Sequence, residues 1–92
     1  MLDTVELLSR LCSTPALSGF EEPMIGLMRK EMSRFSQEVV VERMGNVIAC
    51  LPASRAGGPT LMLMAHMDEL GFMIRKIEPN GFLRVHRLVG IP

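Results

Sequence analysis

Residues 61–71 read LMLMAHMDELG and join an apolar run to a segment with three ionisable residues. Residues 61–65 are all apolar and follow a Gly/Pro-rich break. Such a run predicts a short strand buried on both faces, as in the centre of a largely parallel sheet. In open α/β sheets, functional groups collect just beyond the carboxyl ends of these strands. His66 and Asp68 come directly after the run, so we expect the functional site there.

The spacing of His66 and Asp68 predicts that the two side chains interact. Residues two apart on an extended chain point to the same side. A metal-bound imidazole usually donates its other N–H to a carboxylate, which fixes the tautomer and raises the basicity of the ring. The pattern therefore predicts His66 as a metal ligand and Asp68 as the group that holds its ring. The alternative is that Asp68 caps a helix or loop and that His66 is a buried histidine with satisfied hydrogen bonds.

Two helices are predicted before residue 37. Asp3 and Glu6 form a capping pattern for the first helix, and Pro15 ends it. Residues 18–21 repeat the capping signal for a second helix, in which Pro23 falls in the first turn. Its apolar stripe is expected to pack in the core rather than to bind a partner. The stripe consists of Met24, Met28, Met32 and Phe35.

A β-hairpin is predicted next. Residues 38–42 and 47–51 read as strands because they are rich in β-branched side chains. Residues 44–46, Met-Gly-Asn, suit a tight connection that needs a positive φ.

A second hairpin is predicted after the His-x-Asp segment. Residues 71–77 and 82–89 are strand-like and flank Asn80-Gly81, a strong hairpin signal. Their mixed alternation predicts a half-exposed antiparallel sheet, with His86 as a surface residue. The sequence thus changes near residue 70 from a buried-strand pattern to a half-exposed one, and this change marks a candidate domain boundary.

Composition restricts the class of protein. Ninety-two residues suit one small domain or part of a larger one. Ten acidic and ten basic residues balance, which argues against nucleic acid or a membrane surface as partner. The start of the chain lacks the basic flank of a signal peptide, and no apolar run approaches the ~18 residues of a membrane span. Cys12 and Cys50 are expected to be buried free thiols, and the protein to be cytoplasmic.

The run AHMDELGFM at residues 65–73 resembles the signature of the TET-type co-catalytic metalloaminopeptidases. These are the glutamyl or deblocking aminopeptidases, some of which have also been called cellulases or endoglucanases. The similarity extends to PALSGFEE at residues 15–22, RMGNV at 43–47 and IEPNGFLRVHRLVG at 77–90. It therefore covers nearly the whole chain in order, but only the amino-terminal quarter or so of what a family member contains.

The resemblance implies an α/β fold and a division of the chain. Residues 1–70 would form the amino-terminal part of the catalytic domain, a zinc-peptidase-like α/β sandwich. Residues 71–92 would begin an antiparallel β domain that is inserted into the catalytic domain and serves dimerisation. Family members assemble as dimers and often as hollow dodecamers, so the resemblance also implies a homo-oligomer.

The resemblance further implies a reaction. The family removes amino-terminal residues from peptides with two divalent metal ions, most often zinc or cobalt, and a glutamate as general base. By resemblance, His66 would bind one ion, and Asp68 would be the catalytic-site residue that holds the His66 ring. The family's other ligands and its general base come later in sequence. A catalytic site needs about three protein ligands, and alternation points Glu69 away from His66. We therefore expect these 92 residues alone to bind no metal tightly and to be inactive.

Three hypotheses follow from the sequence. The first is the amino-terminal part of a metalloaminopeptidase that acts on peptides. The second is a non-catalytic module that associates with another protein through exposed sheet edges. The third is a small metal-binding protein whose site is completed across an oligomer interface. Activity against aminoacyl-p-nitroanilides, tested on the gene's full product, separates the first from the others.

Overall fold

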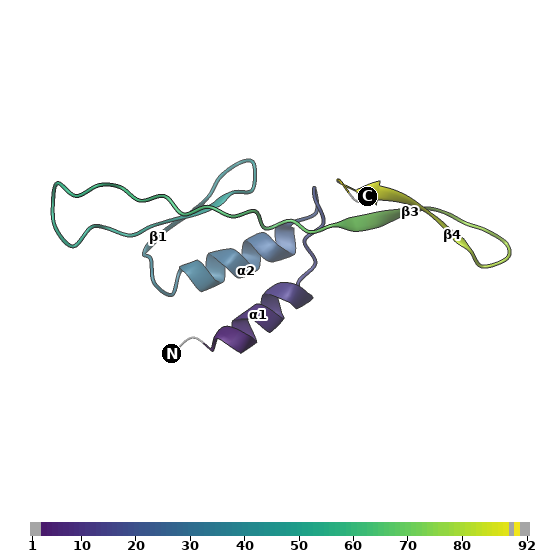
Figure 1. Ribbon diagram of the computed structural model, residues 1–92, viewed down its shortest axis with the longest axis horizontal. Coiled ribbons are helices and arrows are strands. Elements are labelled where there is room, and N and C mark those ends of the chain that lie inside the picture. Colours follow the sequence, from purple (N-terminus) through teal and green to yellow (C-terminus); the bar gives the residue numbers. More distant parts are fainter. Residues whose placement is uncertain (1–2, 89, 91–92) are drawn as a thin grey trace.

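A computed structural model describes residues 3–88 and residue 90. The described residues form an elongated α/β structure that measures 66 × 27 × 23 Å, in which the second hairpin extends away from the helices (Figure 1). Neither helix of this described part is long and apolar enough to cross a membrane. The elements in chain order are α1 (Thr4–Ser13), α2 (Glu22–Met32), β1 (Glu38–Val41), β2 (Val47–Cys50), β3 (Gly71–Ile77) and β4 (Leu83–Leu88).

Helix α1 begins and ends where the sequence predicts. The Asp3 side chain accepts hydrogen bonds from the backbone N–H groups of Val5 and Glu6, at 2.9 and 3.2 Å. These bonds satisfy two of the donors that a helix start leaves unpaired. The helix ends at Ser13, before Pro15. The predicted capping role of Asp3 is confirmed.

Helix α2 begins later than its predicted cap. Its N-cap is Glu21, whose carboxylate accepts no capping bond from the helix and instead accepts from Gly19 N at 2.8 Å. A turn occupies the residues before it, with Phe20 N bonded to Leu17 O at 2.7 Å and Gly19 at a φ of +86°. The prediction that Ser18 starts the helix is therefore wrong, because the local turn uses that segment.

The core of the described structure is small. Ala16 and Met24 are the apolar side chains that are buried among the described residues, at 1% and 6% exposure. The predicted core stripe is confirmed in part: Met24 is buried and Met28 and Met32 are half-buried on α2, which packs on β1 and β2. Phe35 at the end of the stripe is 58% exposed.

A buried charge joins the two helices. Glu31 on α2 is 5% exposed. Its carboxylate forms ion pairs with Arg10 of α1 at 2.7 Å and with Arg34 at 3.1 Å. Burial of a carboxylate is costly unless the charge is paired, so these two arginines make the burial of Glu31 tolerable and fix α1 against α2.

Strands β1 and β2 form the first predicted hairpin. Their register runs from Glu38 opposite Cys50 to Val41 opposite Val47. Gly45 in the turn has a φ of +89°, a conformation that side chains with a Cβ rarely adopt. The prediction of a hairpin here is confirmed.

Strands β3 and β4 form the second hairpin, also antiparallel, with an irregularity between Ile74 and Lys76. The strand predicted at residues 82–89 covers Leu83–Leu88, and Val89 lies outside the described residues. His86 is exposed on β4, as expected. The division of the chain at residue 70 stays a prediction. One face of the hairpin gathers apolar side chains that are 46–69% exposed, namely Phe72, Ile74, Ile77, Leu83 and Val85.

The buried strand predicted at residues 61–65 is wrong for this chain. Those residues lie in the long connection between β2 and β3, which forms no strand (Figure 1). Their side chains from Leu61 to Met64 are 78–87% exposed. A buried strand needs neighbours at both edges, whereas within residues 3–88 each strand pairs only inside its own hairpin. The expected largely parallel sheet is therefore absent from these residues.

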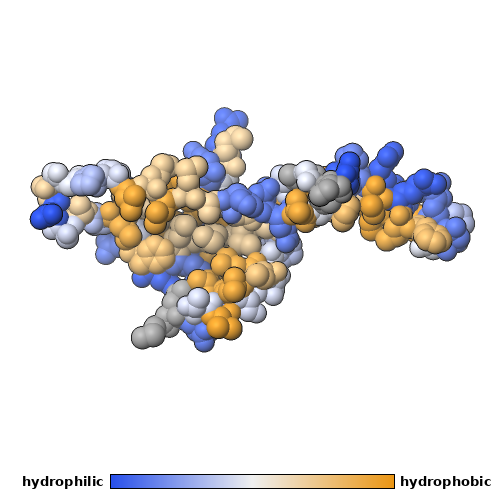
Figure 2. Space-filling view, viewed as in Figure 1, coloured by the Kyte–Doolittle hydropathy of each residue, from blue (hydrophilic) through white to orange (hydrophobic). Residues whose placement is uncertain are grey.

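Large apolar side chains lie on the surface of both the helical part and the second hairpin (Figure 2). Cys12 and Cys50 belong to this uncovered surface: both are free thiols, as expected, but both are exposed. The prediction of buried thiols is wrong because nothing in the described part of the chain covers the faces on which they lie.

Candidate functional site

His66 and Asp68 interact as their spacing predicts. His66 Nδ1 lies 2.9 Å from Asp68 Oδ1 and 3.1 Å from the backbone oxygen of Asp68. A carbonyl oxygen and an ionised carboxylate can only accept hydrogen bonds. The hydrogen therefore belongs on Nδ1, and in the neutral ring the lone pair belongs to Nε2.

The exposure of His66 and the element that follows Asp68 argue against the alternative of a buried histidine beside a helix cap. The His66 side chain is 85% exposed and that of Asp68 is 31% exposed. His66 is thus not a buried histidine with satisfied hydrogen bonds. Asp68 caps no helix among the described residues either, because the next element is strand β3 at Gly71.

The pair fits one ligand of a metal site. An imidazole that donates from Nδ1 to a carboxylate presents Nε2 in the arrangement usual for metal-bound histidine. In residues 3–88 and 90, no group of three or more His, Cys, Asp or Glu side chains is close enough together to hold a metal ion. Within the described residues, the pair therefore offers one imidazole and a carboxylate that orients it, and not a whole metal site.

Glu69 makes the long-range contact that joins this segment to the rest of the chain. Its backbone N–H donates to Ala16 O at 2.8 Å, and its carboxylate accepts from Ala16 N at 3.1 Å. A parallel bridge between Leu17 and Glu69 accompanies these bonds. No pattern in the sequence pointed to Ala16 or Leu17, although both lie in one of the segments that carry the resemblance.

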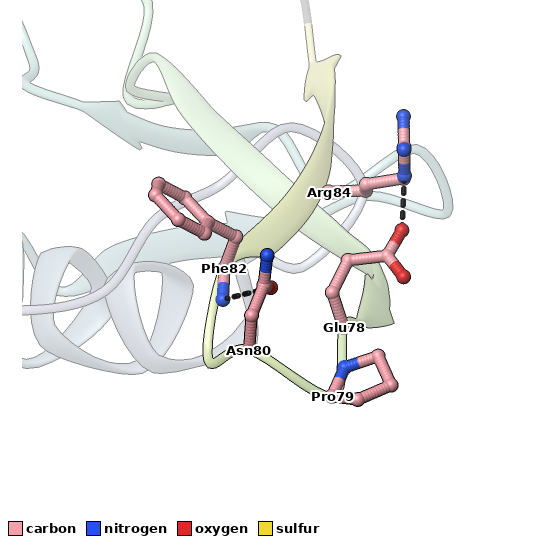
Figure 3. A pocket seen from close by; sticks show the side chains of 5 residues that line it. All are labelled: Glu78, Pro79, Asn80, Phe82 and Arg84. Carbon is pink, nitrogen blue, oxygen red and sulfur yellow. Dashed lines mark hydrogen bonds and ion pairs between the residues drawn. The ribbon is translucent and has the colours of Figure 1, made fainter.

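A second polar group lies at the β3–β4 turn, around a shallow hollow of about 540 Å³ (Figure 3). Glu78 there is paired with Arg84 and, at 3.0 Å, with Lys76. The Arg84 bond, followed by the Lys76 bond, lowers the pKa of Glu78 below its usual range. These ion pairs join the two strands across the turn, so the charges around the hollow already have partners within the hairpin. Its lining residues are Glu78, Pro79, Asn80, Phe82 and Arg84.

Comparison with known proteins defines the class. The chain is 45% identical over 85 residues to SgcX of Escherichia coli (strain K12), which carries the name of an aminopeptidase. It is 34% identical over 87 residues to lysyl aminopeptidase of Pyrococcus furiosus, and 30% identical over 90 residues to glutamyl aminopeptidase of Lactococcus lactis subsp. cremoris. These alignments cover 92%, 94% and 98% of this chain and 23%, 24% and 24% of the relatives.

The Pyrococcus and Lactococcus relatives are aminopeptidases by name, and aminopeptidases are hydrolases. Residues 45–92, just over half of the chain, match the family described as M42 glutamyl aminopeptidase. The chain belongs to this family, which confirms the resemblance seen in the sequence. It spans about a quarter of the length of the curated relatives that it matches. None of the three relatives named here is called a cellulase.

Proposed function

We propose that this chain is the amino-terminal part of a metal-dependent aminopeptidase that hydrolyses amino-terminal residues from peptides. In this proposal His66 is a ligand to one of two divalent metal ions, zinc or cobalt, and Asp68 holds the His66 ring. The 92 residues alone are inactive. Membership of the M42 family and the names of the relatives support the reaction.

The observation that carries the proposal is the contact between His66 Nδ1 and Asp68 Oδ1 at 2.9 Å. The contact fixes the hydrogen on Nδ1, so Nε2 can donate its lone pair to a metal without first losing a proton. The 85% exposure of the His66 side chain leaves room for further ligands from outside the described residues. A divalent ion bound there would polarise the scissile carbonyl or lower the pKa of the attacking water.

The Asp68→Asn substitution tests the role of the carboxylate. In the full-length protein we expect metal affinity and turnover to fall by about 10–100-fold, the usual cost of disturbing a group that orients a metal ligand. The fold should persist, because Asp68 is not in the core. Metal content, kcat and the thermal unfolding midpoint are the measurements.

Asp3→Asn is the matched control for Asp68→Asn. It removes the same charge, and asparagine caps helices about as well as aspartate, so turnover and metal content should stay at the wild-type values. Equal metal affinity for the Asp68→Asn variant and the wild type would refute the role of Asp68.

The proposal also covers the partners of the protein and its location in the cell. We propose a peptide substrate, a homo-oligomeric assembly and a cytoplasmic location, without a nucleic-acid or membrane partner. The balanced charge of the chain supports the exclusion of nucleic acid.

The second candidate function is a non-catalytic module for protein association. The apolar face of the β3–β4 hairpin, with Phe72 at 53% and Leu83 at 51% exposure, is the observation that favours it. An encoding gene that ends at Pro92, together with a gene product that lacks aminopeptidase activity, would favour this candidate over the enzyme.

A further inference from the structure

Glu69 forms two hydrogen bonds with the backbone of Ala16. Its N–H donates to Ala16 O at 2.8 Å, while its carboxylate accepts from Ala16 N at 3.1 Å. The backbone N–H and C=O groups of Ala16 are thus both satisfied by Glu69, 53 positions later in the chain. We call this pair of hydrogen bonds the Ala16–Glu69 latch.

The buried backbone of Ala16 needs the hydrogen bonds of the latch. Ala16 is 1% exposed, and a buried backbone N–H must find a partner other than water. The Glu69 side-chain oxygen is the partner that the structure provides. This requirement is for a hydrogen-bond acceptor at the right distance and not for a negative charge, a distinction that a pair of substitutions can test.

The segment between α1 and α2, which contains Ala16, has further hydrogen bonds of its own. Phe20 N is bonded to Leu17 O at 2.7 Å, and Gly19 N is bonded to the Glu21 carboxylate at 2.8 Å. These two bonds hold the backbone of residues 17–21 in a turn, and the latch joins Glu69 to the residue just before that turn.

Gly71 brings the start of β3 against the same surface. A Cβ added at Gly71 would lie 1.9 Å from Leu17 Cδ2 and 3.3 Å from Leu17 Cγ. A methyl group in that position would force the Leu17 side chain to move. The latch at Glu69 and the close approach of Gly71 to Leu17 thus both join the chain directly after Asp68 to the segment between α1 and α2.

We propose that Glu69 is a positioning residue for the metal site, because the latch sets where the His66–Asp68 pair stands relative to the rest of the fold. The inference rests on the proposed role of His66. On the other side of the pair, residues 61–65 form no strand among the described residues, and Leu61 to Met64 are 78–87% exposed. The tertiary hydrogen bonds next to the pair in this described part are those of the latch. Glu69 contacts Ala16 and acts through the neighbouring Asp68.

Two substitutions in the full-length protein separate the acceptor from the charge. Glu69→Gln keeps a side-chain oxygen at the same reach and loses the charge. Glu69→Asp keeps the charge and withdraws the oxygen by one C–C bond, about 1.5 Å. We expect Glu69→Asp to weaken zinc affinity by about tenfold, the lower end for groups that act through a ligand's neighbour. Glu69→Gln should stay within about twofold of the wild type, since its hydrogen bond is retained.

Zinc affinity is measured by competition with a chromophoric chelator, on protein shown to be folded by its unfolding midpoint without metal. Hydrogen exchange of the Ala16 amide reports the latch itself and should accelerate in Glu69→Asp only. Unchanged zinc affinity in folded Glu69→Asp, or an equal loss in Glu69→Gln, would overturn the inference.

The His66→Ala variant, measured alongside, tells the two proposals apart. If His66→Ala loses zinc and Glu69→Asp does not, the role of the latch is wrong while the metal-ligand role stands. If His66→Ala binds zinc as the wild type does, the metal-ligand role fails and the inference about Glu69 fails with it.

Discussion

The His66→Ala substitution in the full-length protein is expected to remove one metal ligand and reduce turnover by more than about 100-fold. Disturbing a group that only orients a ligand already costs about 10–100-fold, and loss of the ligand itself should cost more. The fold should not suffer, because the His66 side chain is 85% exposed, and substitutions at exposed positions usually change stability by no more than about 0.5 kcal/mol. The measurements are metal content, kcat and the unfolding midpoint.

His86→Ala provides the control for this experiment. His86 is the other histidine of the chain and lies exposed on β4, so its removal takes away an imidazole without touching the candidate site. We expect wild-type turnover and metal content. A His66→Ala protein with wild-type metal content and turnover would show that His66 binds no metal.

The 92-residue chain by itself is expected to hydrolyse no aminoacyl-p-nitroanilide, with or without added zinc or cobalt. At the candidate site the described residues offer the His66 imidazole and the Asp68 carboxylate, whereas a catalytic site needs about three protein ligands. The expected loss is therefore the whole catalytic effect, at least about 10⁶-fold relative to the full-length protein. The full-length protein, assayed under the same conditions, shows that the substrate and metals are suitable.

The His66→Ala version of the 92-residue chain completes this test. If both short chains show the same background rate, the background does not come from the candidate site. Metal-dependent turnover by the short chain that His66→Ala abolishes would contradict the proposal, because it would mean that these residues assemble a working site.

The sequence was a good guide to most features that depend on residues close together in the chain, but the local capping pattern at residues 18–21 did not place the start of α2. Asp3 caps α1 through bonds to residues two and three positions ahead. Gly45 and Gly81 adopt the positive φ values of +89° and +87° expected of hairpin turns. The contact between His66 and Asp68 belongs to the same class, since two residues of backbone decide whether the side chains can meet.

The sequence misled where a feature depends on partners far away in the chain. The apolar run at residues 61–65 has the composition of a buried strand, but composition cannot supply the neighbouring strands that would pair with it. Those side chains are exposed in the described structure. Likewise Cys12 and Cys50 lie beside apolar residues but are exposed, because burial depends on what packs over a face.

The sequence by itself determined the helix start at Asp3, both hairpins, the His66–Asp68 pairing and the resemblance to a family of aminopeptidases. Only the tertiary structure decided that Glu69 is hydrogen-bonded to Ala16, 53 residues earlier, and that Gly71 passes so close to the Leu17 side chain that a Cβ there would clash with it. The physical reason is that caps and turns are closed by hydrogen bonds within a few residues. A contact across 53 residues depends on how whole elements pack, which no local pattern encodes.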